Sequence, residues 1–443
     1  MLAPGQGKAM SAIFAPEAQV QSLLIFEAAL ARAEARAGVI PVEAAEAIAN
    51  GCRVELFDVA TLYQEAATAG TPVIPLVRML TERVELPARG FVHWGATSQD
   101  ALDSALMLQM RAGLDLLISD TQAICASCAR LAEQHRHTLM AGRTLMQQAL
   151  PITFGLKAAH WLAQVTRQTR ALNTHRQHTL AAQLGGAAGT LASLGEQGPL
   201  VMRWLAEELR LPLAELPWHT ERDRVAEIAA TLGILAGSMA KIAGDIILLA
   251  QTEVAEVREA SIPGKGGSSA MPQKRNPVDS INASAAARLA MGIVPIILSA
   301  LPQEHERAAG AWQAEWSAIP MLFAYTASAV ERVYTAVENL QIDPARMRAN
   351  LNITRGLIMA EALTMALAPH MGRPAAYRVV EELSKQVNTS DETLLQAALA
   401  TAQVRSVLSP DELTRTLDPA HYLGSTDILI DRVLATYRAE PVV

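Results

Sequence analysis

The sequence predicts an all-α protein built from long helices. Apolar residues recur at helical spacing through most of the 443 residues, and several of these periodic stretches are much longer than an average globular helix. Alternating strand patterns are scarce, and aromatic residues, which favour strands, make up only 4% of the chain. Alanine, the best helix former, is abundant. These observations together favour a bundle of long helices.

Breaks rich in glycine and proline separate the helical stretches. Leu23, Phe26 and Leu30 share one face of a first helix over residues 23–38, which ends at Gly38. Further long helices are predicted over residues 101–133, 151–184, 223–257 and 278–301. The breaks divide the chain into an N-terminal helical domain, a central long-helix bundle and a C-terminal helical domain, at residues 1–95, 96–342 and 343–443.

Composition narrows the class of protein. Apolar residues make up 51% and charged residues 18%, so the chain has ample material for a core and is not disordered. The formal charge is −7 without a long basic run, which argues against nucleic acid as a partner. The start lacks a secretory leader, and the apolar stretch 289–301 is too short to span a membrane. We therefore expect a cytoplasmic protein with no membrane partner.

The three cysteines do not suggest a disulfide framework. Cys52, Cys125 and Cys128 form an odd, sparse set that is typical of a reducing compartment. Cys125 and Cys128 match a C-x-x-C pattern, but residues three apart share one helix face, so packing is favoured over a redox role. The sequence also lacks the histidine and cysteine spacings of metal sites, so we expect no metal.

The most glycine-dense stretch is the strongest candidate for chemistry. It covers residues 261–277, SIPGKGGSSAMPQKRNP, and glycine-rich backbone offers free N–H groups to an oxyanion. Ser268, Lys274 and Asn276 add a hydroxyl, an ammonium and an amide. The stretch is not a P-loop, because Lys265 precedes glycine instead of serine or threonine. A solvated surface loop is the alternative, but loops between long helices are common functional sites.

This stretch brings a resemblance to a known family. Residues 267–277, GSSAMPQKRNP, resemble the signature loop of the fumarase/aspartase superfamily. Residues 95–100, GATSQD, and 142–151, GRTLMQQALP, resemble its first and second shared blocks, so the resemblance covers nearly the whole chain. Three further phrases resemble a cycloisomerase branch of the superfamily: PWHTERDR at 217–224, PQEHER at 302–307 and DPAHYLG at 418–424.

The resemblance implies a fumarase/aspartase-like three-domain fold with a central bundle of five long helices. It also implies a homotetramer with a twenty-helix core, in which each active site is shared between three subunits. The apolar excess fits such an assembly, because a tetramer covers helix faces that a monomer would expose. Members of this branch need no cofactor, so none is expected here.

The resemblance assigns roles to residues of the three blocks. Superfamily members add or eliminate a group next to a carboxylate, so the site must hold the negative charge of a carbanion. Ser268 is expected to be the general acid or base, and its hydroxyl would need a lowered pKa. Lys274 and Asn276 are expected to bind the activated carboxylate. The further substrate-binding residues that the resemblance implies are Thr97, Ser98, Arg143 and Thr144.

The second block departs from the lyase pattern in a way that bears on the reaction. Lyases and fumarases carry histidine at the position of Leu145 or of Gln148, and this sequence has neither. Expulsion of an amine or hydroxide needs a general acid, whereas a carboxylate, with a pKa near ~4, leaves without one. The departure therefore favours intramolecular lactonisation. The resemblance to the cycloisomerase branch implies that the substrate is a small tricarboxylate of the muconate class. Gln148 can only position substrate by hydrogen bonds.

Other polar residues near these blocks allow two interpretations. His93, His219 and His305 could each contact an anionic substrate or have a structural role, and His93 and His305 are taken as substrate-binding candidates. Arg222 and Arg224 could bind substrate carboxylates, or form a buried ion-pair network with Glu221 and Asp223. Trp312 and Trp316, four residues apart, are expected to pack rather than stack on substrate.

Two other functions remain open at this stage. An adenylosuccinate lyase-like C–N lyase, which releases fumarate, would need a phosphate-binding surface, but the start over residues 11–14 carries no arginine. A catalytically inactive helical scaffold is the second alternative, since fold alone never establishes function. The intact Ser268, Lys274 and Asn276 argue against a scaffold. The substituent on the muconate is left open, because pocket shape decides it.

Overall fold

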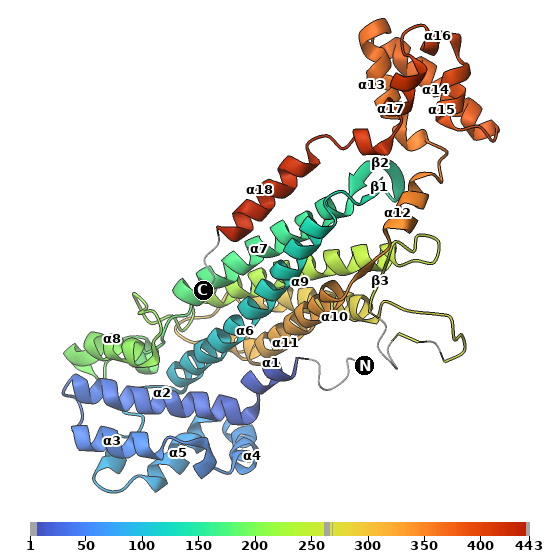
Figure 1. Ribbon diagram of the computed structural model, residues 1–443. Coiled ribbons are helices and arrows are strands. Elements are labelled where there is room, and N and C mark those ends of the chain that lie inside the picture. Colours follow the sequence, from blue (N-terminus) through green and yellow to red (C-terminus); the bar gives the residue numbers. More distant parts are fainter. Residues whose placement is uncertain (1–6, 261–265, 268, 440–443) are drawn as a thin grey trace. The chain divides into compact units, whose positions relative to one another are not determined.

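The computed structural model describes residues 7–260, 266, 267 and 269–439. Within them the chain is mostly helical, as predicted, and also contains two antiparallel strand pairs, β1–β2 and β3–β4. Figure 1 shows the helices and strands along the chain. They form two compact units: Met1–Gln122, Arg167–Lys241 and Asn282–Arg332 make up the first, and Ala123–Thr166, Ile242–Ile281 and Val333–Val443 the second.

The N-terminal helices of the first unit pack around α2. Leu23, Phe26 and Leu30 on α2 are all buried, as their spacing predicts, and α2 packs against α3 and α8. The helix begins earlier than predicted, because Pro16 fits its first turn. The helices are α1 (Lys8–Ile13), α2 (Pro16–Arg36), α3 (Val42–Gly51), α4 (Val59–Ala69), α5 (Val73–Arg83) and α8 (Gly198–Leu209), with short 3-10 turns η1 (Val54–Leu56), η2 (Ala88–Phe91), η3 (Gly186–Ala188) and η4 (Gly195–Gln197).

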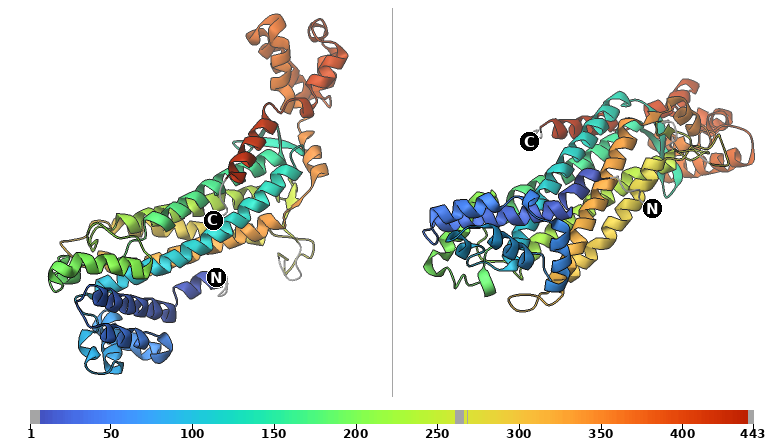
Figure 2. Two further views of the ribbon diagram at one scale, coloured as in Figure 1. Left: turned by 60° about the vertical axis from the view of Figure 1, so that its left-hand side comes forward. Right: turned by 90° about the horizontal axis from the view of Figure 1, so that it is seen from below.

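The longest helices contribute residues to both units, because each boundary between the units falls within one of them. They are α6 (Ser98–Gln134), α7 (Phe154–His178), α9 (Asp223–Leu249), α10 (Val278–Ser299) and α11 (Ala311–Glu338), and Figure 2 shows them from two further directions. In the first unit, a Cβ on Gly113 would lie 2.8 Å from the Phe323 ring, and one on Gly233 would lie 2.7 Å from Val294. Glycine thus permits close approach of α6 to α11 and of α9 to α10.

A β-hairpin replaces the predicted start of one helix. The helix predicted over 151–184 begins only at Phe154, because β1 (Leu139–Thr144) pairs with β2 (Gln147–Thr153). This correction places the whole second block on a hairpin. Leu145 and Met146 form its turn with φ of 49° and 67°, without the asparagine–glycine signal that usually marks such turns.

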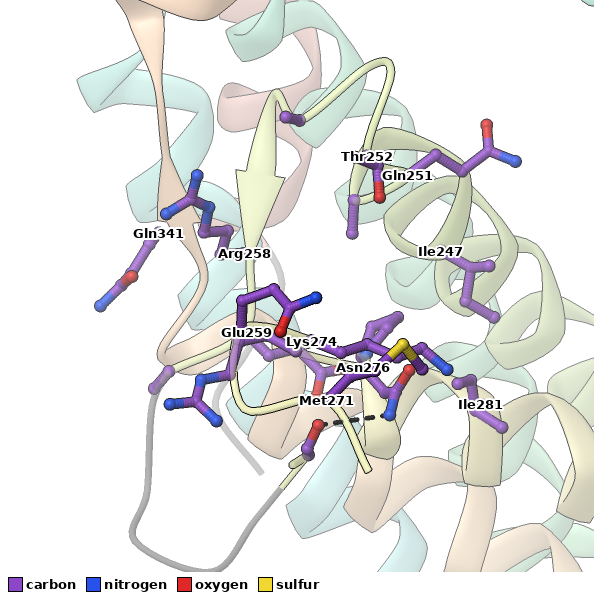
Figure 3. Close-up of a pocket in the computed structure, with 17 residues that line it drawn as sticks. Ile247, Gln251, Thr252, Arg258, Glu259, Met271, Lys274, Asn276, Ile281 and Gln341 are labelled. Carbon is purple, nitrogen blue, oxygen red and sulfur yellow. Dashed lines mark hydrogen bonds between the residues drawn. The ribbon is translucent and has the colours of Figure 1, made fainter. Parts of the chain in front are cut away.

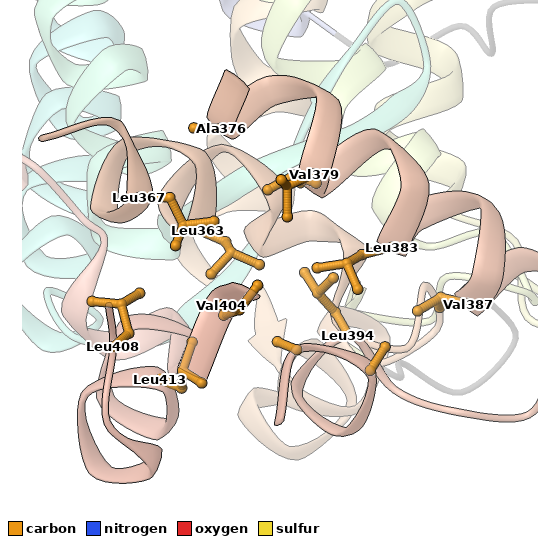
Figure 4. Close-up of a cluster of buried hydrophobic side chains, with 13 residues drawn as sticks. Leu363, Leu367, Ala376, Val379, Leu383, Val387, Leu394, Val404, Leu408 and Leu413 are labelled. Atoms are coloured by element: carbon orange, nitrogen blue, oxygen red, sulfur yellow. The ribbon is translucent and has the colours of Figure 1, made fainter. Parts of the chain in front are cut away.

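The C-terminal helices of the second unit enclose a core of their own. Leu363, Leu383, Val404 and Leu413 belong to this cluster of buried side chains, shown in Figure 4. The elements are β3 (Val257–Arg258), β4 (Gln341–Ile342), α12 (Pro344–Leu351), α13 (Ala360–Met371), α14 (Arg373–Thr389), α15 (Leu394–Ala400), α16 (Ala402–Arg405), α17 (Pro410–Thr416) and α18 (Thr426–Arg438), with 3-10 turns η5 (Leu357–Met359) and η6 (Pro419–His421). The three-domain division stays a prediction.

The C-x-x-C pair lies in the helical core. Cys125 and Cys128 lie on α6 outside any disulfide, with exposed fractions of 3% and 0%, which confirms the packing interpretation. Burial, reinforced by the charge of Cys125, raises the pKa of the Cys128 thiol well above its ordinary value. A thiol in such surroundings is chemically inert.

Candidate functional site

The glycine-dense segment lines a cleft in the second unit. The cleft has a volume of about 900 Å³. In Figure 3, Arg258 and Gln341 come from the paired strands β3 and β4, whereas Ile247 comes from α9. Its polar lining consists of Gln251, Thr252, Arg258, Glu259, Gln273, Lys274, Arg275, Asn276 and Gln341. Of the predicted catalytic residues, Lys274 and Asn276 therefore meet here, and Ser268 lies outside the described residues.

Two sets of hydrogen bonds hold the described part of the segment. The Glu259 carboxylate accepts the main-chain N–H groups of Asp279 at 3.0 Å and Ser280 at 2.8 Å, at the N-terminus of α10, where a negative charge is favoured. Asn276 donates its main-chain N–H at 2.9 Å and its Nδ2 at 3.3 Å to the Gly266 carbonyl. The Asn276 amide, which was expected to bind substrate, thus also joins Asn276 to Gly266 within the same segment.

The cleft carries uncompensated positive charge. The side chains of Arg258, Lys274 and Arg275 form no hydrogen bond or ion pair with any described residue, and all three residues are exposed. The only carboxylate lining the described cleft, Glu259, is engaged by the N-terminus of α10. Three cations without a described partner around one cleft favour a ligand with several carboxylates.

The hairpin places two second-block residues next to each other. Arg143 and Gln148 are direct cross-strand partners. The Arg143 guanidinium forms a bidentate ion pair with Glu256, at 2.7 and 3.0 Å, and Gln148 Nε2 donates to the Asn350 carbonyl at 2.9 Å. Thr144 is exposed beside the turn. Sequence reasoning missed Glu256 and Asn350, because neither lies in a recognisable motif.

The first block lies in the first unit and is organised by a buried carboxylate. Thr97 and Ser98 stand at the N-terminus of α6, and Asp100 in its first turn is fully buried. Four donors surround this carboxylate: the main-chain N–H groups of Thr97 at 3.0 Å, Gly185 at 2.8 Å and Gly186 at 2.9 Å, and Nε2 of His219 at 2.7 Å. His219 is therefore committed to holding the first block, which supports its structural interpretation.

The two histidine candidates of the first unit have different surroundings. His93 Nδ1 lies 2.6 Å from the Glu27 carboxylate. Burial alone would lower the pKa of His93, but the charge of Glu27 raises it above its ordinary value. His305 is exposed, with φ of 50°, and two residues later Arg307 is anchored by Gln99 Oε1 at 3.0 Å. His305 itself makes no hydrogen bond with the described residues.

Arg222 belongs to a buried ion-pair network, one of the two interpretations that its sequence context allowed. Its partners are Asp103, at 2.8 and 3.0 Å, and Glu315, at 3.1 Å, and not the adjacent acidic residues that the sequence suggested. Trp312 Nε1 donates to Asp103 at 3.2 Å. Its ring lies 4.9 Å from that of Trp316 in an edge-on arrangement, as packing predicts.

Comparisons with known proteins assign the fold and the blocks to a family. A sequence model described as lyase matches residues 6–292, and one described as adenylosuccinate lyase C-terminus matches residues 356–433. The chain is 47% identical to the 3-carboxy-cis,cis-muconate cycloisomerase of Pseudomonas aeruginosa, over 97% of this chain and 94% of that protein. The chain belongs to the fumarase/aspartase superfamily.

Two further relatives agree with this assignment. A 3-carboxy-cis,cis-muconate cycloisomerase of Bradyrhizobium diazoefficiens is 46% identical over 96% of this chain and 95% of its own length. The crystal structure of 3-carboxy-cis,cis-muconate lactonizing enzyme from Pseudomonas putida matches with a TM-score of 0.92 at 41% identity, covering 97% of each chain. The fumarase/aspartase fold that the three sequence blocks imply is thus confirmed.

Proposed function

We propose that the protein is a 3-carboxy-cis,cis-muconate cycloisomerase that forms 4-carboxymuconolactone in protocatechuate degradation. The observation that carries this assignment is the cleft of the signature segment, where Arg258, Lys274 and Arg275 have no described counter-ion. A tricarboxylate offers three negative groups to three cations. The cycloisomerase relatives from two bacteria, at 46% and 47% identity, support the same substrate.

The proposed chemistry uses Lys274 and Asn276 of this cleft together with Ser268, and it needs no cofactor. One substrate carboxylate oxygen adds to the conjugated double bond and closes a five-membered lactone, and its intramolecular position supplies much of the rate advantage. The electron pair of that bond moves toward the carbon next to a second carboxylate, which Lys274 and Asn276 stabilise as it takes up negative charge. Ser268 then donates the proton to that carbon.

The second block does not need to supply an acid for this reaction. In the reverse direction the leaving group is a carboxylate, whose pKa near ~4 allows it to leave unprotonated. Gln148 stands where lyases carry a histidine, and it is engaged with the Asn350 carbonyl. Its role is to hold substrate or hairpin by hydrogen bonds. Thr97, Ser98, Thr144, His93 and His305 are proposed as further substrate contacts.

We further propose a soluble, cytoplasmic homotetramer whose active sites are shared between three subunits. By length and composition α9 and α10 could cross a membrane. However, the chain belongs to a family of soluble enzymes, and a second copy explains the apolar surface equally well. Exposed apolar side chains on α10 that another subunit would cover are Ile281, Leu289, Met291, Ile296 and Leu298. Light scattering during size-exclusion chromatography tests the tetramer.

A cofactor-free ultraviolet assay tests the activity. Purified protein is mixed with 3-carboxy-cis,cis-muconate in buffer with a chelator, and the loss of diene absorbance is followed. Rapid loss with a lactone product supports the proposal and excludes a requirement for free metal. No loss, together with fumarate release from adenylosuccinate, would identify a C–N lyase instead. No reaction with either compound would favour an inactive scaffold.

A further inference from the structure

We infer that Glu256 and Asn350 are positioning residues that orient the Arg143 guanidinium toward a substrate carboxylate. The inference rests on the proposed function, because it assigns a use to a second-block residue. It concerns the second unit alone, where the hairpin, the start of β3 and α12 come together. Neither Glu256 nor Asn350 belongs to any of the three shared blocks.

The ion pair fixes one end of the guanidinium. The Glu256 side chain has no exposed surface, whereas a quarter of the Arg143 side chain is exposed. Glu256 Oε1 accepts from Arg143 Nη2 at 2.7 Å, and Oε2 accepts from Nη1 at 3.0 Å. A buried carboxylate needs such a counter-ion, so the position and the plane of the guanidinium are set by Glu256.

Two donors of Arg143 have no partner in the described part of the chain and are available to an anion. A guanidinium carries five N–H groups. The two on Nη1 face Glu256 and the Ala141 carbonyl, which lies at 3.3 Å, and one on Nη2 faces Glu256. The Nε–H and the second Nη2–H make no hydrogen bond with the described residues. These two donors form a side-on fork that matches the two oxygens of a carboxylate.

Asn350 contacts both Glu256, the partner of Arg143, and Gln148. It is 1% exposed, and its Nδ2 donates to Glu256 Oε1 at 2.7 Å and to the Val254 carbonyl at 2.8 Å. The main-chain carbonyl of Asn350 accepts a hydrogen bond from Gln148 Nε2 at 2.9 Å. Because Arg143 and Gln148 are cross-strand partners, Asn350 contacts one directly and the other through Glu256.

A contribution to stability does not by itself explain the buried polar cluster of Arg143, Glu256 and Asn350. Well-packed apolar side chains often stabilise a fold as well as a buried ion pair does. An ion pair that leaves two donors of the same guanidinium free instead gives a rigid, correctly oriented anion-binding group. Such pre-organisation favours binding and catalysis because little orientational freedom is lost when substrate arrives.

A double-mutant cycle tests whether Glu256 acts through Arg143. The wild type, Glu256→Gln, Arg143→Ala and the double variant are compared by kcat and KM for 3-carboxy-cis,cis-muconate. We expect Glu256→Gln to lower kcat/KM by roughly ten- to a hundred-fold, the size of a charge-assisted hydrogen bond, and to have almost no further effect beside Arg143→Ala. Losses that multiply would show a general structural role and overturn the inference.

A matched pair of variants on the end of α12 tests Asn350. Asn350→Ala removes both side-chain bonds but keeps the carbonyl that accepts from Gln148, and should lower kcat/KM in the same direction. Asn352→Ala, on an exposed residue two positions later, should behave as the wild type. Equal behaviour of the two variants would overturn the role of Asn350. If Glu256→Gln does not fold, Asn350→Ala takes its place in the cycle with Arg143→Ala.

The same cycle separates this inference from the proposed function. A wild type without turnover would refute the proposed activity but not the positioning of Arg143. The cycle is then read from the Kd of propane-1,2,3-tricarboxylate, measured by calorimetry. An effect of Glu256→Gln on Kd that disappears beside Arg143→Ala would support the inference. Multiplying effects, or no binding to the wild type, would overturn it.

Discussion

Hydrogen bonds between Glu259 and Ser280 join the two residues that flank the glycine-dense segment 261–277. The Glu259 carboxylate accepts both the main-chain N–H of Ser280, at 2.8 Å, and its hydroxyl, at 2.7 Å. Glu259 directly follows β3 and Ser280 lies in the first turn of α10, so these hydrogen bonds hold the end of β3 next to the start of α10. The same carboxylate caps the helix, and this contact joins helix stability to the geometry of the cleft.

Glu259→Ala should weaken both the helix start and catalysis. Loss of a capping acceptor costs about 1 kcal/mol, and a looser segment holds Lys274 and Asn276 less well. We expect a lower melting temperature and a lower kcat. Glu253→Ala, on a nearby exposed residue, is the matched control. A variant with an unchanged melting temperature would show that the hydrogen bonds of Glu259 to the start of α10 do not stabilise the protein in solution.

Ser268→Ala should abolish turnover without changing assembly. The variant removes the hydroxyl that is proposed to deliver the proton, while the segment keeps its glycines and Lys274. Turnover is measured by the diene assay, and the oligomeric state by light scattering. Wild-type turnover in an intact assembly would remove Ser268 from the mechanism.

Gln148→Ala should impair substrate binding more than the chemical step. A glutamine amide cannot deliver a proton at neutral pH, so its loss removes hydrogen bonds, including that to the Asn350 carbonyl. We expect KM to rise while kcat falls little. A fall in kcat as deep as that of Ser268→Ala, at unchanged KM, would contradict this role.

Glu34 should make stability fall as pH rises. It is fully buried on α2, and neither carboxylate oxygen has a hydrogen-bond partner among the described residues. Burial, and then the charge of Glu27, raise the pKa of Glu34 from 4.5 to about 9. The folded state therefore keeps a proton that the unfolded chain releases. The contribution of protonated Glu34 to the free energy of unfolding is complete below pH 4.5. It is lost between pH 4.5 and about 9, by up to about 1.4 kcal/mol per pH unit.

Glu34→Gln provides the measurement for that dependence. Glutamine imitates the protonated acid and does not titrate, so the variant should melt at a higher temperature than the wild type near about pH 8 and similarly near about pH 5. Melting temperatures are compared at one protein concentration, because assembly also contributes to stability. Parallel pH profiles of the two proteins would rule out Glu34 as the titrating group.

The sequence blocks led to a segment that lines a cleft, whereas helical periodicity placed the elements of the fold only in part. GSSAMPQKRNP at 267–277 led directly to the segment that lines the cleft, because a functional loop keeps its residue types in sequence order. Helical periodicity located α6 and α10 within three residues at each end. It missed α11, and it extended a helix through Pro151, which lies in β2.

The sequence by itself determined the helical class and the family, and it named the candidate site residues, because these depend on local spacing and on contiguous motifs. The tertiary structure alone decided which charged groups meet. Arg143 pairs with Glu256, and Arg222 with Asp103 and Glu315. These partners lie far apart in the chain, and an ion pair is set by chain reversal and burial, which no local pattern encodes.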